Sequence, residues 1–338
     1  MGENIAQYTA DPYVVSKITF PELGEHCYAV KVSPCGKFVA CTFGNGVVRI
    51  LDANTYEPLQ RNKLGSPYDD LPSTCVKWGA RTESGEYTLV STSAAGVVFG
   101  WVWDGSSFAE RVFRLPEDKN DTAALDFSPD GKHFVTGGSD RSIRVYSFDE
   151  KKVSQVMVKG VDAEGHSRVA HNNRIFSVRY VSPTAVVSGG WESPVQVWDL
   201  RTGRSERQVS GSQIGADSIE PIVGTTRFIT ASNRSTQQIQ VFDYVTCREI
   251  EEDSLRLTAA CGKTQLSGVR YCAHTKSIWV ICLKPHTVMQ VDYASGKVLG
   301  IVECKVPVMG LDVSDHHPGK VFIACMNEAV IVVEGRAQ

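Results

Sequence analysis

The sequence lacks several features that define common classes of functional site. Its 338 residues contain no C-x-x-C pair, no glycine-rich phosphate loop and no apolar run long enough to cross a bilayer. The formal net charge of −3 gives no strongly basic surface for nucleic acid. The opening residues, MGENIAQYTADPYVV, have no basic segment followed by an apolar one, so no secretory signal is expected. We therefore expect no membrane insertion, no nucleic-acid partner, no metal and no cofactor.

Cysteine is present, but its spacing does not fit disulfide or zinc chemistry. The ten cysteines are scattered along the chain, and Cys41, Cys282 and Cys325 lie within apolar, strand-like runs. A reduced cysteine in such a run behaves as a small buried hydrophobe. Because reduced thiols are typical of reducing compartments, the sequence predicts a cytoplasmic protein, with the nucleus as an open alternative.

A hydrophobic run that ends in an acid recurs seven times. Examples are VVRILD, VQVWD and VIVVE, and successive acids are 42 to 52 residues apart. A repeat of about 40–50 residues is the period of a four-stranded propeller blade. The seven acids are Asp52, Asp104, Asp149, Asp199, Asp243, Asp292 and Glu334.

The interior of each unit indicates strands joined by tight turns. Segments 30–41 and 124–138 each hold two alternating strands around Ser-Pro-x-Gly, a sequence suited to a β-turn. The last unit lacks a fourth strand, whereas YVVSKITF at 13–20 is a spare one. We expect this N-terminal strand to complete the last blade, which removes two exposed sheet edges. The prediction is an all-β, seven-bladed propeller forming a single domain over 1–338.

These repeats resemble the WD40 repeat family, and the resemblance covers nearly the whole chain. It is clear in units three and four and weaker toward the C-terminus. Unit four, with its flanks AHNNRIFSVRY and GADSI, is also similar to a poorly characterised group of WD-repeat proteins from flagellated and ciliated cells. The family resemblance implies a non-enzymatic scaffold for proteins or peptides, and the group resemblance implies a cytoskeletal or flagellar assembly. The oligomeric state stays open.

The family resemblance also implies a buried polar relay in unit four. Its members would be the turn acid Glu192, His171 before the first strand, Ser188 on the second and Trp198 on the third. Unit three keeps the acid, at Asp140, but no histidine precedes it. An acid, a histidine and a serine could also form a hydrolase triad. A nucleophilic serine needs an exposed position beside oxyanion donors, whereas Ser188 lies inside a strand, so we favour the structural relay.

In this family, the residue before the turn acid and two near the start of the first strand commonly contact partners. Here these positions are Trp191, Arg174 and Phe176, and Tyr28 is the corresponding position of unit one. A tryptophan, a phenylalanine and an arginine together have the composition of an interface hot spot. The alternative is that Phe176 packs in the central channel while Trp191 only covers its own blade.

Three long segments should surround this group. They are the connections 158–173 and 210–218 and the turn 232–238, which we expect to rise from the same top rim beside unit four. The acids of 249–254 are expected to form a solvated outer edge. We therefore predict partner docking on the top rim around blades three to five.

A second surface motif begins on the same strand. VVSGGWESPVQVWDLR fits, with Glu192 in place of aspartate, a sixteen-residue box of propellers that serve cullin-type ubiquitin ligases as substrate receptors. Asp199 and Arg201 would then be contacts on the opposite, bottom rim. A substrate receptor of such a ligase is the alternative function.

Overall fold

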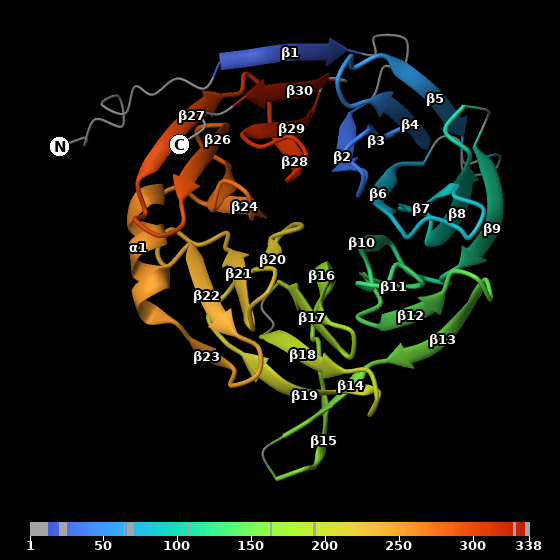
Figure 1. Cartoon of the computed structure of the whole chain (residues 1–338). Helices are drawn as coiled ribbons and strands as arrows, with labels where there is room; N and C mark the ends of the chain where they lie inside the picture. The colour runs from blue at the N-terminus through green and yellow to red at the C-terminus, as the bar shows by residue number, and fades with distance from the viewer. Residues whose placement is uncertain are drawn as a thin grey trace.

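Seven antiparallel sheets stand as blades around a central axis (Figure 1). The computed structural model describes residues 13–19, 26–63, 65, 71–106, 109–162, 164–191, 194–326 and 329–334. The sheets follow one another around the ring in chain order, and each blade runs outward from its first strand to its last. The all-β, seven-bladed propeller predicted from the repeat is therefore confirmed.

The first three blades are regular four-stranded sheets. Their strands are β2 (Cys27–Val32), β3 (Phe38–Phe43), β4 (Val47–Asp52) and β5 (Pro58–Lys63) in blade one; β6 (Ser73–Trp78), β7 (Tyr87–Ser93), β8 (Val97–Trp103) and β9 (Glu110–Pro116) in blade two; and β10 (Thr122–Phe127), β11 (His133–Gly138), β12 (Ile143–Ser147) and β13 (Lys152–Met157) in blade three.

Blades four to six keep this order with two additions. Their strands are β16 (Ile175–Ser182), β17 (Ala185–Gly190), β18 (Val195–Asp199) and β19 (Arg204–Val209); β20 (Ile219–Pro221), β21 (Arg227–Ala231), β22 (Ile239–Asp243) and β23 (Arg248–Glu249); and β24 (Leu266–Cys272), β25 (Ser277–Cys282), β26 (Thr287–Asp292) and β27 (Val298–Glu303). The additions are a hairpin of β14 (Lys159–Val161) and β15 (Ser167–Val169) at blade four, and the helix α1 (Glu251–Cys261) at blade five.

Blade seven is made from both ends of the described chain. It contains β28 (Val308–Val313), β29 (Lys320–Cys325), β30 (Ala329–Glu334) and, outermost, β1 (Tyr13–Thr19). β1 pairs antiparallel with β30 from Tyr13 opposite Glu334 to Thr19 opposite Ala329. The ring is thus closed by the N-terminal strand, as the sequence predicts; Phe20, the last residue of the expected strand, lies outside the described residues.

The hydrophobic core is divided among the seven seams between consecutive blades. Each of seven buried clusters in the described chain combines side chains of two neighbouring blades. The seam between blades seven and one, for example, packs Phe322 and Val332 against Phe43 and Leu51. A strand can be apolar on both faces because every blade has a neighbour on each side. This explains near-continuous apolar runs such as VVRILD.

Blade five departs from the expectation for residues 249–254. The sequence predicts a solvated acidic edge, and Glu251 and Glu252 are indeed exposed at the start of α1. Asp253, however, is buried against Arg227, Arg256 and Tyr293, whose polar atoms lie 3.0, 2.6 and 2.7 Å from its carboxylate. The helix covers the outer side of blade five beyond the two-residue strand β23.

Within the described part of the chain, no helix is long and apolar enough to span a membrane.

Removing residues 1–19 should destabilise the ring, because β30 then loses its outer partner and blade seven has three strands. We expect the melting temperature to fall by roughly 5–10 °C in a thermal scan. A synthetic peptide of residues 13–19, added in excess, should restore part of the loss. An unchanged melting temperature would contradict a closure role for β1.

Candidate functional site

The top rim is the end of the propeller where the inner strands begin. In six blades the second residue of the inner strand is bulged out of the pairing with the next strand. A bulge re-aims its side chain and increases the local twist. Six side chains are therefore presented near the top mouth of the channel. They are Tyr28, Thr74, Ala123, Phe176, Ser267 and Met309.

Three of the predicted partner-binding residues meet on this rim. Phe176 and Trp191 lie with ring centroids 5.1 Å apart, and the guanidinium carbon of Arg174 lies 5.7 Å from the Phe176 ring centroid. Trp191 is 44% exposed, and its indole N–H has no hydrogen-bond partner among the described residues. Arg174 also pairs with Asp121 of blade three at 2.6 Å. The result is an aromatic ledge, formed by Phe176 and Trp191 and flanked by the Arg174–Asp121 ion pair.

Blade five supports the free edge of this aromatic ledge. A Cβ atom built on Gly215 would lie 3.1 Å from the indole nitrogen of Trp191, so the connection 210–218 packs against the ring. That connection is tied to the turn 232–238, because Gln213 N–H donates to Ser232 Oγ at 2.9 Å and Asn233 N–H to Gln213 O at 3.1 Å. Two of the three predicted loops therefore lie together beside Trp191.

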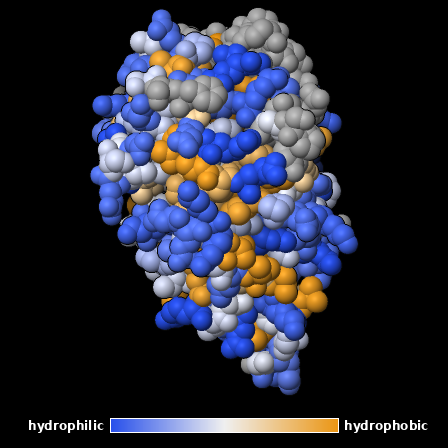
Figure 2. Space-filling model, turned by 90° about the vertical axis from the view of Figure 1, so that its right-hand side faces the viewer, coloured by the Kyte–Doolittle hydropathy of each residue, from blue (hydrophilic) through white to orange (hydrophobic). Residues whose placement is uncertain are grey.

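The third predicted loop, 158–173, is arranged differently from the expectation. It contains the hairpin of β14 and β15, and β14 pairs in parallel with β19, the outer strand of blade four, at Gly160 opposite Ser205. The hairpin therefore extends the outer edge of the blade (Figure 1). Four valines of β13, the hairpin and the residue between them are exposed: Val153, Val156, Val158 and Val169. Figure 2 shows hydrophobic surface over the lower part of the right-hand side of the molecule.

Tyr28 is not brought into contact with the aromatic ledge. It occupies the bulged position of β2 in blade one, equivalent to Phe176 in β16, but blades one and four are not neighbours in the ring. The two aromatic residues therefore share a register around the mouth without forming one cluster.

Three of the four predicted relay residues in blade four, His171, Ser188 and Trp198, are described, and they form a chain of hydrogen bonds. His171 Nε2 and Trp198 Nε1 each lie 2.7 Å from Ser188 Oγ. The indole N–H of Trp198 donates to Ser188 Oγ, and the serine hydroxyl can in turn donate to an unprotonated His171 Nε2. The neutral imidazole then carries its proton on Nδ1, which is buried without a described partner. Glu192, the expected partner, lies outside the described residues.

Burial fixes the charge state of this relay. His171 is 1% exposed, and burial, together with the positive charge of Arg168, lowers its pKa to about 3. Ser188 is fully buried as well. A serine in that position has no access to a substrate, which argues against a hydrolase triad.

Blade three forms an analogous network with a residue that the sequence analysis missed. Glu117 is buried, accepts the hydroxyl of Tyr146 at 2.7 Å and is hydrogen-bonded to Thr136. Its second oxygen accepts from Thr122 and Asn120 at 2.6 Å. A carboxylate thus occupies the place where blade four has histidine, and Asp140 pairs instead with Arg144. The pattern was hidden because an acidic acceptor replaces the residue type that the family pattern expects.

On the bottom rim, Arg201 forms an ion pair with Asp199 of the same turn. Its Nε and terminal nitrogen donate to the two oxygens of Asp199 at 3.0 and 2.6 Å, and the pKa of Asp199 is lowered to about 2 chiefly by this contact. The arginine is 73% exposed, but its charge is matched within the turn. The structure therefore places the two predicted bottom-rim residues together as a bidentate pair.

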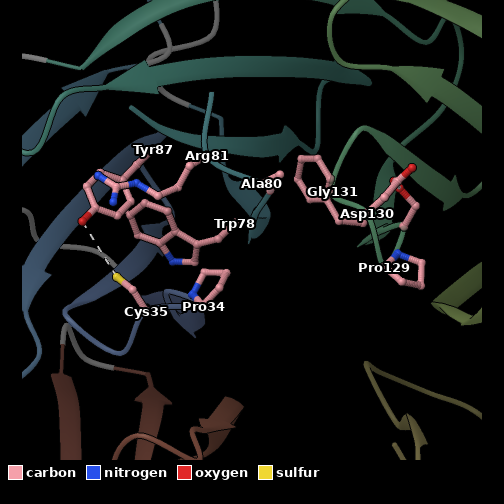
Figure 3. A pocket seen from close by; sticks show the side chains of 12 residues that line it. Pro34, Cys35, Trp78, Ala80, Arg81, Tyr87, Pro129, Asp130 and Gly131 are labelled. Carbon is pink, nitrogen blue, oxygen red and sulfur yellow. Dashed lines mark hydrogen bonds between the residues drawn. The ribbon is translucent and has the colours of Figure 1, made fainter. Parts of the chain in front are cut away.

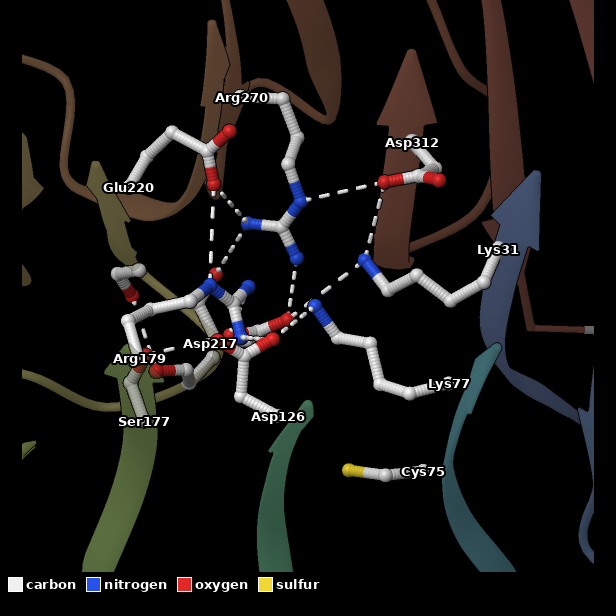
Figure 4. Close-up of polar contacts among 12 residues, drawn as sticks. Lys31, Cys75, Lys77, Asp126, Ser177, Arg179, Asp217, Glu220, Arg270 and Asp312 are labelled. Atoms are coloured by element: carbon white, nitrogen blue, oxygen red, sulfur yellow. Dashed lines mark hydrogen bonds and ion pairs between the residues drawn. The ribbon is translucent and has the colours of Figure 1, made fainter. Parts of the chain in front are cut away.

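The central channel contains the largest polar cluster that the sequence analysis missed. The seven inner strands each present one charged residue at an equivalent register, and the segment before β20 adds an eighth (Figure 4). Four are basic and four acidic, so the belt is neutral. The channel belt consists of Lys31, Lys77, Asp126, Arg179, Asp217, Glu220, Arg270 and Asp312.

Asp217 joins several blades through the channel belt. It accepts ion pairs from Arg179 at 2.6 Å and from Arg270, and Lys31 lies 3.8 Å away. Burial alone would raise its pKa, but the charges of Arg179, Arg270 and Lys31 hold that pKa well below the ordinary value. Burial also lowers the pKa of Lys31 to about 8, with repulsion from Arg270 adding to the effect.

The acidic members of the belt also bind backbone of the next blade. Asp126 accepts the N–H of Tyr180 at 2.9 Å, and Asp312 accepts the N–H of Val32 at the same distance. A small hollow of about 10 Å³ lies between blades six and seven, beside Asp217 and Arg270. The belt therefore ties neighbouring blades together around the axis.

One group of side chains has a composition that could hold a metal ion. Asp162, Glu164 and His166, at the tip of the β14–β15 hairpin, have ligand atoms within 4.8 Å of one another, and all three are exposed. Exposed acidic groups of this kind are common on protein surfaces without an ion, so the cluster alone assigns no function.

Residues 110–147 match the WD40 family, described as WD domain, G-beta repeat. The match runs from β9 through β12, so one sequence repeat joins the outer strand of blade two to three strands of blade three. The chain is thus a seven-bladed β-propeller in which blade three, with the strand before it, matches the WD40 repeat.

Similar proteins include the Ribosome biogenesis protein WDR12 homolog of Drosophila virilis, 25% identical over 186 residues, which are 53% of this chain and 43% of that protein. The homologue of Drosophila erecta is 25% identical over 146 residues, 41% of this chain and 34% of that protein. That of Drosophila mojavensis is 24% identical over 157 residues, covering 44% and 37%. The matched region spans less than half the length of these curated relatives.

Stability should depend on pH through His171. The unfolded chain takes up a proton near pH 6.5, whereas the folded chain does so only near pH 3. The free energy of unfolding should therefore fall below about pH 6.5, by up to about 1.4 kcal/mol per pH unit. Urea denaturation at several pH values measures this slope. His171→Asn should reduce it, and the exposed control His166→Asn should not; equal slopes in all three proteins would refute the buried neutral histidine.

Arg179→Leu should strongly destabilise the propeller, because Asp126, Asp217 and Glu220 would lose a buried counterion. We expect the free energy of unfolding to fall by about 3–5 kcal/mol in chemical denaturation. Arg201→Leu, which removes an exposed pair, is the matched control and should remain close to wild type. Equal effects of the two substitutions would show that the channel belt does not tie the blades together.

Proposed function

We propose that the chain is a non-enzymatic scaffold that binds a partner protein on the top rim, through the aromatic ledge of Phe176 and Trp191. The observation that carries this proposal is the contact between these two rings beside Arg174, with the indole N–H of Trp191 unpaired among the described residues. Partly exposed aromatic rings that are held in place before binding lose little conformational entropy when a partner covers them.

Three further features support docking over catalysis. Gly215 of blade five packs against Trp191, and Arg174 beside Phe176 pairs with Asp121 of blade three, so the aromatic ledge is supported from both neighbouring blades. The relay serine is buried, and the charged side chains of the channel belt are paired with one another. The relay and the channel belt therefore hold strands and blades together.

The biological setting that we propose is ribosome assembly, because the relatives reported above are named ribosome biogenesis proteins. Those names give no support to the cytoskeletal or flagellar assembly, nor to the ligase receptor, that the sequence led us to consider. The bidentate Asp199–Arg201 pair likewise gives the ligase alternative no free cation. Because ribosomes contain RNA, the expectation that nucleic acid is not a partner stays a prediction.

Affinity purification from native extract tests the docking surface. Trp191→Ala and Phe176→Ala should each reduce recovery of the main partner about tenfold or more, as expected for a central hot spot. Arg201→Ala should leave recovery unchanged, and circular dichroism should show that all variants are folded. Loss of a ligase adaptor with Arg201→Ala alone would establish the alternative, and no change in any variant would refute both surfaces.

Two additions test the setting. Tagged protein should co-sediment with ribosomal precursors and not with cytoskeletal fractions. Ribonuclease treatment before purification separates the modes of contact: a bound set that survives it is held by protein, whereas a bound set that disappears is held through RNA.

A further inference from the structure

A pocket of about 360 Å³ opens on the bottom rim, at the opposite end of the axis from the aromatic ledge (Figure 3). Its walls come from three turns, each joining the first and second strands of blades one, two and three: residues 33–37, 79–86 and 128–132. This volume falls within the range of small-ligand sites and accommodates a leucine or phenylalanine side chain with adjoining backbone. None of the predicted partner-binding or relay residues lines it, although two of its turns are the Ser-Pro-x-Gly turns noted in the sequence.

The pocket is built on fixed backbone. The indole N–H of Trp78 donates to Lys31 O at 2.9 Å, and His316 of blade seven lies with Nε2 3.0 Å from Pro34 O. Gly131 has φ +67°, and a Cβ atom there would come within 2.3 Å of Ala80 N, so the turns of blades two and three are in close contact. A preformed pocket of this kind needs little ordering when it binds.

The interior is mainly apolar and aromatic, whereas one lip carries an unmatched positive charge. Trp78, Tyr87 and Phe127 form much of the wall. The exposed Arg81 lies with its guanidinium carbon 4.3 Å from the Tyr87 ring centroid, and it has no carboxylate partner among the described residues. Asp130, toward the opposite end in Figure 3, is already bonded by Ser128 Oγ at 2.5 Å and by a backbone N–H of its own turn.

The outline of the pocket suits an extended segment. Cys35, Tyr87 and Arg81 stand at one end and Pro129 and Asp130 at the other, with Trp78 and Pro34 between them (Figure 3). If a bound extended segment places an apolar side chain in the middle of the pocket, the next residue of that segment lies over Arg81. A carboxylate there would complete the charge of Arg81 and accept hydrogen bonds from its guanidinium.

We propose that this bottom-rim pocket binds a short acidic segment of a partner protein. The segment inserts one apolar side chain between Trp78 and Phe127 and pairs an adjacent carboxylate with Arg81. The site is separate from the aromatic ledge on the top rim, so its existence does not depend on docking there.

Cys35 supplies a local reporter of occupancy. Its thiol lines the pocket, with Sγ 3.4 Å from Ser33 Oγ and 3.9 Å from the Tyr87 hydroxyl. Burial opposes ionisation of this thiol, but these hydrogen bonds lower its pKa below the ordinary value, and the thiolate is the form that alkylating agents attack. Cys247, partly buried in a turn of blade five, is an internal control outside the pocket.

The first measurement is the rate of iodoacetamide labelling at Cys35 and Cys247 of the whole chain, followed by mass spectrometry. The probe is the capped peptide acetyl-Asp-Leu-Asp-amide, compared with acetyl-Lys-Leu-Lys-amide and acetyl-Asp-Ala-Asp-amide. The acidic leucine peptide should slow labelling of Cys35 about threefold or more at saturation without changing Cys247, and the other two peptides should protect less. Equal protection by all three peptides, better protection by the lysine peptide, or no protection would each overturn the proposal.

A fluorescein-labelled copy of the acidic leucine peptide gives a second measurement that does not depend on thiol reactivity. Fluorescence anisotropy should show binding to wild type and a loss of about tenfold with Arg81→Gln or with Cys35→Phe, which fills the pocket. Lys132→Gln removes a positive charge from the wall turn 128–132, at a residue that does not line the pocket, and should bind as wild type. If Lys132→Gln and Arg81→Gln weaken binding equally, or neither does, the specific contact with Arg81 is refuted.

Discussion

The structure depends on the neutralisation of charge along its axis. Seven inner strands converge there, and at one register each presents a buried or half-buried charged residue. The charged residue of one blade finds its counterions on neighbouring blades. Arg179, for example, pairs with Asp126 of blade three and with Asp217 and Glu220 of blade five. Isolated charges in this environment are costly, whereas a neutral belt with short contacts is tolerated. The blades are therefore coupled through polar contacts at the axis as well as through the seven hydrophobic seams.

The sequence predicts the frame of this molecule because the frame is local and repeated. Each blade is specified by a run that ends in an acid and by turns such as Ser33–Gly36, and the missing last strand is visible as a spare strand at 13–20. The channel belt is different, because its members come from different blades and no short motif links them. The burial of Asp253 in helix α1 could not be predicted for another reason. Its carboxylate pairs with Arg227 and accepts a hydrogen bond from Tyr293, and both residues are distant in the sequence.

The candidate site divides in the same manner. The neighbours Arg174, Phe176 and Trp191 could be grouped from family positions, because strand register brings them together. The support of Trp191 by Gly215 could be expected only roughly, and the hairpin of β14 and β15 was mistaken for a top-rim loop. The bottom-rim pocket could be found only from the structure. Pro34, Ala80 and Gly131 come from three blades, and nothing in the sequence shows that their turns enclose a space.

Closure of the ring by β1 has a consequence for synthesis on the ribosome. β1 is the first described strand to be synthesised and its partner β30 is the last, so β1 cannot pair with β30 until the strands between them have been made. Until then the nascent chain exposes the unpaired strand β1 at one end and an incomplete blade at the other. Either edge could pair with a strand of another chain. Completion of blade seven therefore requires both ends of the described chain, and a chain arrested before Ala329 would keep both sheet edges exposed.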